Sequence, residues 1–353
     1  MNNRWFALFL VMVMVVSRFG VVSAKADDES SKIISEIRTA LPYLLENELS
    51  GEFFLGSQMS AYKAENDMLV EIDYELYPVF QNEKIVAFAS VENNSLGERV
   101  VGCSVGFANA LYECNALEIC SAYALIYSAE GVYLVGNNGM RWLVSDVVNE
   151  HYSSFDAVDE YLEDIDYEPI KRISAFADVP ALCTIIDTKI ISVPYVANDV
   201  MPECEVADCH AGLCWAASMA MIVRCYTGVS YTAREFHEDS GYHSYGSCND
   251  YKSCLSKYGI SSNLLYVFGK NYIQNAVDSN LIGYMRVQNL SSESGLVVVA
   301  CGYAIDETGI AGFYYVDPNY ALCYQTFPSS GDLVVTTMGG TTYSFDYWLV
   351  AQR

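Results

Sequence analysis

The sequence has few basic residues. It holds 19 Lys and Arg against 44 Asp and Glu, so its net charge is −25. A surface with this charge repels nucleic acid and anionic membranes. No basic run interleaved with aromatic residues is present either. We therefore expect no nucleic-acid partner.

Metal-ligand spacings are absent as well. The sequence contains no Cys-x-x-Cys pair and no two histidines at ligand spacing. Structural zinc sites are built from such pairs. We therefore expect no metal site, and nothing in the sequence indicates any other cofactor.

A long apolar run occurs only near the N-terminus. The run "WFALFLVMVMVV" follows Arg4, and small-residue cleavage sites follow at "VSA" and "AKA". This order is typical of an export signal, and the run is short for a membrane-spanning helix. We predict that residues 1–26 are a signal peptide. The mature chain is then secreted and has no membrane contact; an uncleaved anchor is the alternative.

The composition predicts a folded, exported protein of about two domains. Apolar residues make up 52% of the chain and aromatic residues 13%, enough for a large core. Twelve cysteines in an exported chain indicate disulfides. The pairings cannot be read from the sequence.

The chain divides near residue 188. Before it, residues 27 to about 50 predict an amphipathic helix, and residues 77–91 and 121–145 predict hairpins. This half therefore resembles one helix laid on an antiparallel sheet. The acidic stretch "FDAVDEYLEDIDYEP" predicts an exposed connector. After residue 189, a helix apolar on nearly every face precedes short helices and a run of strands. The predicted fold class is α+β.

Cys214 lies in the first turn of that apolar helix, in "GLCWAASMAMIVRCYTG". The positive end of a helix dipole stabilises a thiolate, and Trp215 would shield the thiol from solvent. A cysteine among Ala, Met and Ile can equally be a packed core residue. The local sequence leaves both interpretations open.

Three segments in order resemble papain-like cysteine peptidases, in particular the bacterial secreted members of the staphopain and streptopain kind. They are "LCWAAS" preceded by "VPYVAN", then "GLVVVACGY", then "FYYVDPN". The resemblance implies a papain-like peptidase domain over 189–353. The segments "FFLGSQMSAYK" and "YPVFQNEKIVAFASV" resemble the cystatin-like propeptide of such zymogens, which implies that kind of domain over 27–188. The implied partners are a peptide or protein in the cleft and the chain's own propeptide-type domain.

In the family, a Cys thiolate attacks a peptide bond and a His on a facing strand moves the proton. The resemblance makes Cys214 the nucleophile. The family's His stands seven residues before the tyrosine that matches Tyr303, and this sequence has Leu296 there. Asp317 matches the residue that orients the His, with Asn319 as the other candidate.

The family's oxyanion-binding Gln is missing too. Six residues before Cys214 stands Asp208, whose negative charge suits an oxyanion poorly. Asn198 can take this role if the loop after it is an insertion.

The four histidines are His151, His210, His237 and His243. We expect surface positions for His237 and His243 and no chemical role for His151. The resemblance thus predicts a papain-like homologue that is inactive or impaired. The alternatives are an active zymogen that uses an unrecognised base such as His210, and a protein that captures acyl groups on Cys214 without a His.

Overall fold

The structure is a computed structural model. It describes residues 29–38, 40–45, 52–72, 75–82, 84–93, 97, 99–106, 108, 120–145, 152–176, 187–199, 212–242, 247–288, 295–328, 333–336 and 342–353. The expected export signal lies outside these residues. Among the helices in the described ranges, none is both long and apolar enough to cross a membrane.

The fold is α+β with mainly antiparallel sheets, as the sequence predicts. The larger sheet has its strands in the order β10 (Arg172–Ala175), β1 (Phe53–Gly56), β4 (Glu75–Gln81), β5 (Lys84–Asn93), β6 (Arg99–Ser104), β16 (Ala321–Thr326), β15 (Gly309–Asp317), β14 (Gly295–Asp306), β13 (Gly283–Gln288), β18 (Thr342–Gln352) and β12 (Ser261–Leu265). Strand β11 (Asp187–Ile190) pairs with β14, and β17 (Val334–Thr336) pairs with β18.

A smaller sheet lies entirely in the first half of the chain. Its order is β3 (Met68–Glu71), β2 (Ser60–Glu65), β7 (Tyr123–Ser128), β8 (Gly131–Gly136) and β9 (Arg141–Ser145). Strands β2 and β7 are parallel. The expectation of a single antiparallel sheet in this half is therefore wrong, because β2 pairs with a strand about 60 residues later rather than with its hairpin neighbour alone.

The hairpins themselves are confirmed. Strands β4 and β5 pair antiparallel across a turn in which Asn82 has a positive φ of 55°. Strands β7, β8 and β9 form an antiparallel meander over the predicted residues. Near the N-terminus, residues 29–37 and α2 (Leu41–Leu44) are helical.

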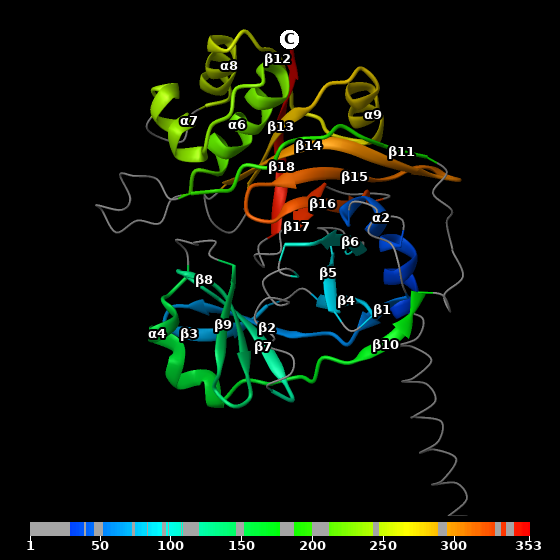
Figure 1. Cartoon of the computed structure of the whole chain (residues 1–353), viewed down its shortest axis with the longest axis vertical. Coiled ribbons are helices and arrows are strands. Elements are labelled where there is room, and N and C mark those ends of the chain that lie inside the picture. Colours follow the sequence, from blue (N-terminus) through cyan, green and yellow to red (C-terminus); the bar gives the residue numbers. More distant parts are fainter. Residues whose placement is uncertain are drawn as a thin grey trace, which may run out of the picture.

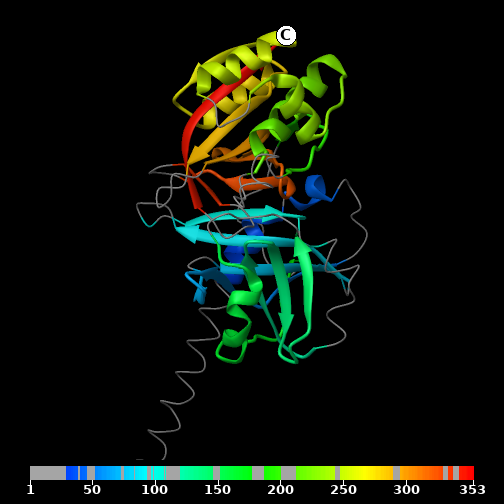
Figure 2. The same cartoon turned by 90° about the vertical axis from the view of Figure 1, so that its left-hand side faces the viewer.

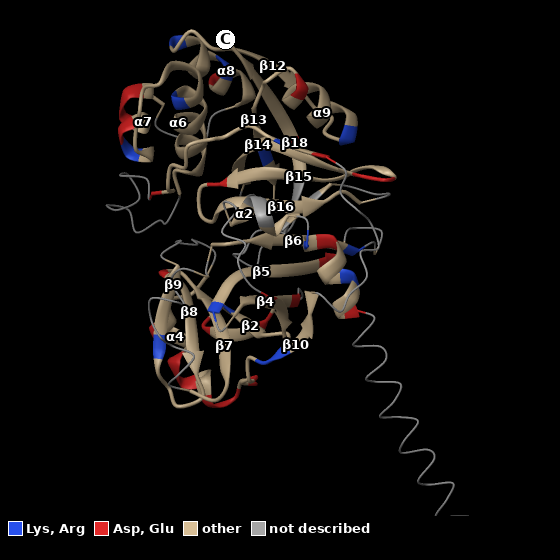
Figure 3. Cartoon of the chain, turned by 45° about the vertical axis from the view of Figure 1, so that its right-hand side comes forward, with Lys and Arg blue, Asp and Glu red and all other residues tan. Residues whose placement is uncertain are grey.

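The acidic stretch expected as a connector is folded. It forms α4 (Phe155–Val158) and the 3-10 helix η2 (Asp159–Glu163), where Ser154 caps the first turn. Phe155 is buried, and its ring lies 4.6 Å from that of Tyr133. Strand β10 then continues the larger sheet beside β1. Acidic residues colour part of this segment red in Figure 3, and Asp156, Asp159 and Glu163 are exposed, whereas Phe155 and Val158 are buried.

The helices of the second half lie at one end of the molecule, opposite the smaller sheet (Figures 1 and 2). They are α6 (Cys214–Thr227), α7 (Ala233–Ser240), α8 (Cys248–Lys257) and α9 (Lys270–Asp278). Helix α6 has its first ten residues buried, as its apolar sequence predicts, and ends at Gly228 with φ 78°. Helix α9 lies in a segment for which the sequence pattern predicted no helix.

Candidate functional site

The site is built around the start of α6, which holds Cys214. Ala216, Ala217 and Ala220 are fully buried, and helix α6 packs on β14. One turn after the cysteine, the hydroxyl of Ser218 donates a hydrogen bond of 3.0 Å to the carbonyl oxygen of Val297. This bond ties α6 to the main chain of β14 beside Cys214.

Cys214 lies where β14 and β15 separate. The two strands pair up to Val299 and Val316. Beyond that pair, the backbone N–H of Val297 interacts with the Cys214 thiol and the Val297 carbonyl accepts the Ser218 hydroxyl, so α6 takes the place of β15 beside β14. Asp317, the next residue after Val316, ends β15 at the same point.

Burial raises the pKa of the Cys214 thiol to about 11. The Val297 N–H lowers the pKa, and the nearby Asp317 carboxylate raises it. Only 7% of the residue is exposed. The effect of burial on the pKa of this thiol is thus larger than the opposite effect of the helix dipole, so the thiol is protonated at neutral pH.

Asp317 is fully buried. Its Oδ1 accepts a hydrogen bond of 2.8 Å from the backbone N–H of Asn319, while its Oδ2 has no hydrogen-bond partner among the described residues. Burial raises the pKa of this carboxyl to about 7, although the Asn319 N–H acts in the opposite direction. The group therefore changes charge near neutral pH, close enough to the Cys214 thiol to act on its pKa.

Leu296 lies on β14, directly before Val297 and opposite Val287 of β13. It is 4% exposed and belongs to the same apolar core as Cys214. Its side chain has no atom that can accept a proton. The position at which the sequence resemblance led us to look for a base is thus occupied by a buried hydrocarbon.

Asn198 reaches the site from the segment before α6. Its amide Nδ2 donates to Oδ1 of Asn319 at 2.9 Å, and its backbone N–H donates to the Pro318 carbonyl at 2.9 Å. A Cβ added at Gly212 would lie 2.9 Å from that Nδ2, so Gly212 permits the close approach. Asn198 therefore joins the turn after Asp317 to the residues just before α6.

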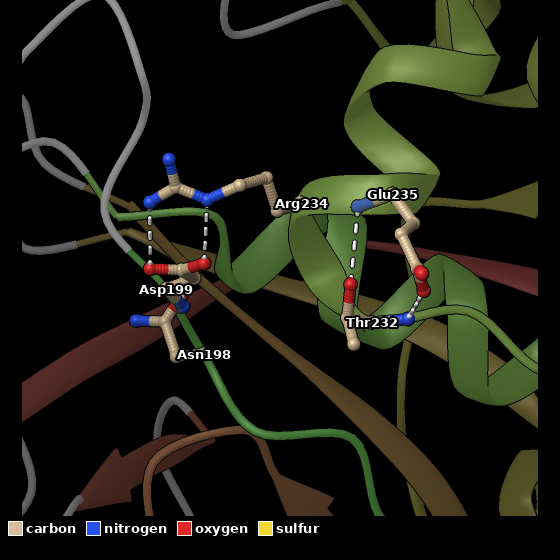
Figure 4. Close-up of polar contacts among 5 residues, drawn as sticks. All are labelled: Asn198, Asp199, Thr232, Arg234 and Glu235. Atoms are coloured by element: carbon tan, nitrogen blue, oxygen red, sulfur yellow. Dashed lines mark hydrogen bonds and ion pairs between the residues drawn. The ribbon is translucent and has the colours of Figure 1, made fainter.

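The neighbouring Asp199 holds the same segment in place. Its carboxylate binds the Arg234 guanidinium of α7 through two contacts of 3.0 and 3.2 Å (Figure 4). Its carbonyl accepts a hydrogen bond of 2.7 Å from the Leu213 N–H. Residues 198–199 and 212–213 are thus neighbours in space. An insertion between two such neighbouring segments requires this proximity of its ends. Asp208 lies outside the described residues.

Trp215 is 1% exposed and packs among the side chains of the neighbouring helices. Its ring lies 5.8 Å from that of His237 and 5.9 Å from that of Tyr251. His237 is itself buried, so its expected surface position is wrong; α7 packs this face against α6. The other three histidines, His151, His210 and His243, lie outside the described residues.

Tyr284 of β13 is a neighbour that the sequence analysis missed. It is fully buried, and its ring packs 5.0 Å from that of Tyr251. Burial is the main cause that raises the pKa of its hydroxyl, and the charge of Cys214 is a smaller cause in the same direction. Nothing in the alternation of "LIGYMRV" distinguishes it from a core tyrosine. It adds a second acidic group to the surroundings of the thiol.

Within the described ranges, no three His, Cys, Asp or Glu side chains are grouped as metal ligands. The eight cysteines of these ranges are free thiols in the structure. No model of a known protein family matches the chain, and a search of curated proteins finds no match.

Proposed function

We propose that this chain is an exported papain-like cysteine peptidase homologue, with a cystatin-like domain before it, that binds peptide chains without cutting them efficiently. One observation carries the proposal. Cys214, at the start of the buried helix α6, interacts with the backbone N–H of Val297, and the residue before Val297 is Leu296, which the resemblance matches to the family's base. The pKa of about 11 for Cys214 supports the same conclusion.

The loss of turnover expected without a catalytic base favours peptide binding over peptide cleavage. Loss of the base of a catalytic triad can cost about six orders of magnitude in turnover. Asn198 is the candidate oxyanion donor, because its amide lies against Gly212, two residues before Cys214, although its Nδ2 also donates to Asn319. One oxyanion donor is worth about two to three orders of magnitude. It cannot replace the missing base.

The substitution Leu296→His tests the proposal. An imidazole at this position would be a base beside Cys214, and the Oδ2 of Asp317 could accept its other N–H. In the full chain, we expect the turnover of a fluorogenic peptide library to rise at least about a hundredfold over wild type.

Two controls isolate the base. Leu296→Gln introduces a polar side chain of similar size that cannot take a proton, and Leu296→His/Cys214→Ala removes the nucleophile. Neither should gain activity. A folded Leu296→His variant without any gain would refute the assignment of position 296.

Wild-type turnover equal to that of Leu296→His would favour the active zymogen instead. His210 is the first candidate base in that case, and His210→Ala would then abolish the activity. Accumulation of an acyl adduct on Cys214 without turnover, detected by intact mass, would favour acyl capture.

A further inference from the structure

The two halves of the chain share one sheet. Strand β6 of the first half pairs with β5 on one side and with β16 of the second half on the other. In the second pairing Ser104 faces Cys323, Cys103 faces Tyr324 and Gly102 faces Gln325. The larger sheet therefore crosses the boundary between the halves without an edge.

This junction is as buried as the core. Ser104, Cys323, Tyr324 and Gln325 are each no more than 3% exposed. At the end of the pairing, the Val101 N–H donates a hydrogen bond of 3.0 Å to the hydroxyl of Thr326. Without β6, strand β16 would be an open edge with unpaired backbone groups and apolar surface exposed to water.

The contact reaches the turn that holds Asp317. The Ser104 hydroxyl donates to the Tyr320 carbonyl at 3.4 Å, and the Tyr320 N–H donates to the Asp317 carbonyl at 3.1 Å. Gly106 lies against Tyr320 so closely that an added Cβ would be 3.0 Å from its ring. The first half thus supports the turn at the candidate site.

We infer that the first half is a permanent part of the protein: the β16 edge is a docking surface for β6 of the same chain, and it retains the first half even after the chain is cut between them. The occupant is β6 because its register, burial and side-chain bonds fill this edge. Pairing of an added strand supplies backbone hydrogen bonds along the edge. The inference is independent of any peptidase activity.

A cut between the halves tests the inference. A recognition sequence for a site-specific protease is inserted between residues 180 and 181, and the purified full chain is cut under native conditions. At a protein concentration of about 1 μM, which is typical for the dissociation constants of specific complexes, we expect both pieces to elute together in size exclusion. They should separate only in denaturant. Separate elution, or aggregation of one released piece, would overturn the inference.

Two variants show whether the junction holds the pieces. Gly106→Leu places a side chain against Tyr320, and the matched control Gly269→Leu adds the same side chain at an extended position with nothing within 4 Å. Thr326→Val removes the acceptor of the Val101 N–H at nearly constant volume. In the cut protein, we expect Gly106→Leu and Thr326→Val each to raise the dissociation constant of the two pieces at least about tenfold, which corresponds to about 1.4 kcal/mol. The control Gly269→Leu should leave the dissociation constant unchanged.

The circular dichroism of each uncut variant shows that it is folded before the cut. If both junction variants hold the two pieces together as tightly as the cut wild type does, β6 is not what joins the halves, and the inference is wrong.

Discussion

The reactivity of Cys214 should depend on pH as expected for a buried thiol without a cationic partner. With a pKa of about 11, roughly 1 in 4,000 of its thiols is ionised at pH 7.4, against roughly 1 in 14 for a free cysteine. The thiolate population is therefore lower by about 300-fold. The more basic thiolate is about tenfold more nucleophilic, because exchange rates rise with thiol pKa.

These two effects combine into a measurable rate. We expect thiol–disulfide exchange at Cys214 to be at least about 20-fold slower than in an unfolded cysteine peptide at pH 7.4. The burial of Cys214 slows it further. From about pH 7.5 to 10 the logarithm of the rate should rise by about one per pH unit without reaching a plateau.

Asp317 should leave a signature in this profile. Its pKa is about 7, so it becomes negative as the pH rises through 7, and this charge raises the pKa of Cys214. The slope should therefore flatten near pH 7. Asp317→Asn should remove the flattening and increase the rate above about pH 7.5.

The assay is exchange with a small aromatic disulfide, followed by mass spectrometry of the peptide that contains Cys214. Cys214→Ser serves as the control for the other eleven cysteines of the chain. A rate that reaches its plateau below about pH 8 would refute the reasoning, because it would require a cation beside the thiol.

Three further predictions concern stability. The carboxyl of Asp317 has a folded pKa of about 7 against its ordinary value of 3.8, so its stabilising protonation is fully present below about pH 4 and lost as the pH rises through 7. Asp317→Asn should therefore raise the free energy of unfolding relative to wild type more at pH 8 than at pH 5, by about 2.6 kcal/mol in urea unfolding, the linkage difference between a folded pKa of about 7 and an unfolded pKa of 3.8; an equal change at both pH values would contradict this. Ser218→Ala should cost about 1 to 3 kcal/mol in urea unfolding, since it leaves the Val297 carbonyl without its hydroxyl donor; a neutral result would mean that the bond does not hold α6 to β14. Gly228→Ala should lower the free energy of unfolding by about 1 kcal/mol because of the positive φ at this position. Gly269→Ala, at an extended position, should not have this strain cost. Equal losses in the two variants would show that the backbone conformation is not the cause.

Much of the local structure could be predicted from the sequence. Helix α6 is apolar on nearly every face and ends at a glycine, so its burial and its C-terminus follow from residues within one segment. The pattern Thr-x-x-Glu marks the start of α7, where Thr232 and Glu235 exchange bonds of 2.8 and 3.1 Å (Figure 4). Hairpins such as β4–β5 follow from alternation around a turn, because both strands are close in the chain.

At the candidate site, the residue types could be predicted but not their environment. The sequence shows a cysteine at a predicted helix start and a leucine at the position that the resemblance would match to a histidine. From the helix position and the missing imidazole alone, we expect a thiol pKa near the free value of about 8.5. Only the packed structure shows that burial and the Asp317 carboxylate raise the pKa of Cys214.

The partners of the strands were decided by the tertiary structure. The alternation in β2 and β6 indicates strands, but it does not specify that β2 runs parallel to β7 or that β6 joins β16, which lies more than about 200 residues later in the chain. An edge strand offers the same backbone groups to any partner of suitable register. The choice depends on buried side chains such as Ser104 and Cys323, which are separated in sequence and meet only when the whole sheet forms.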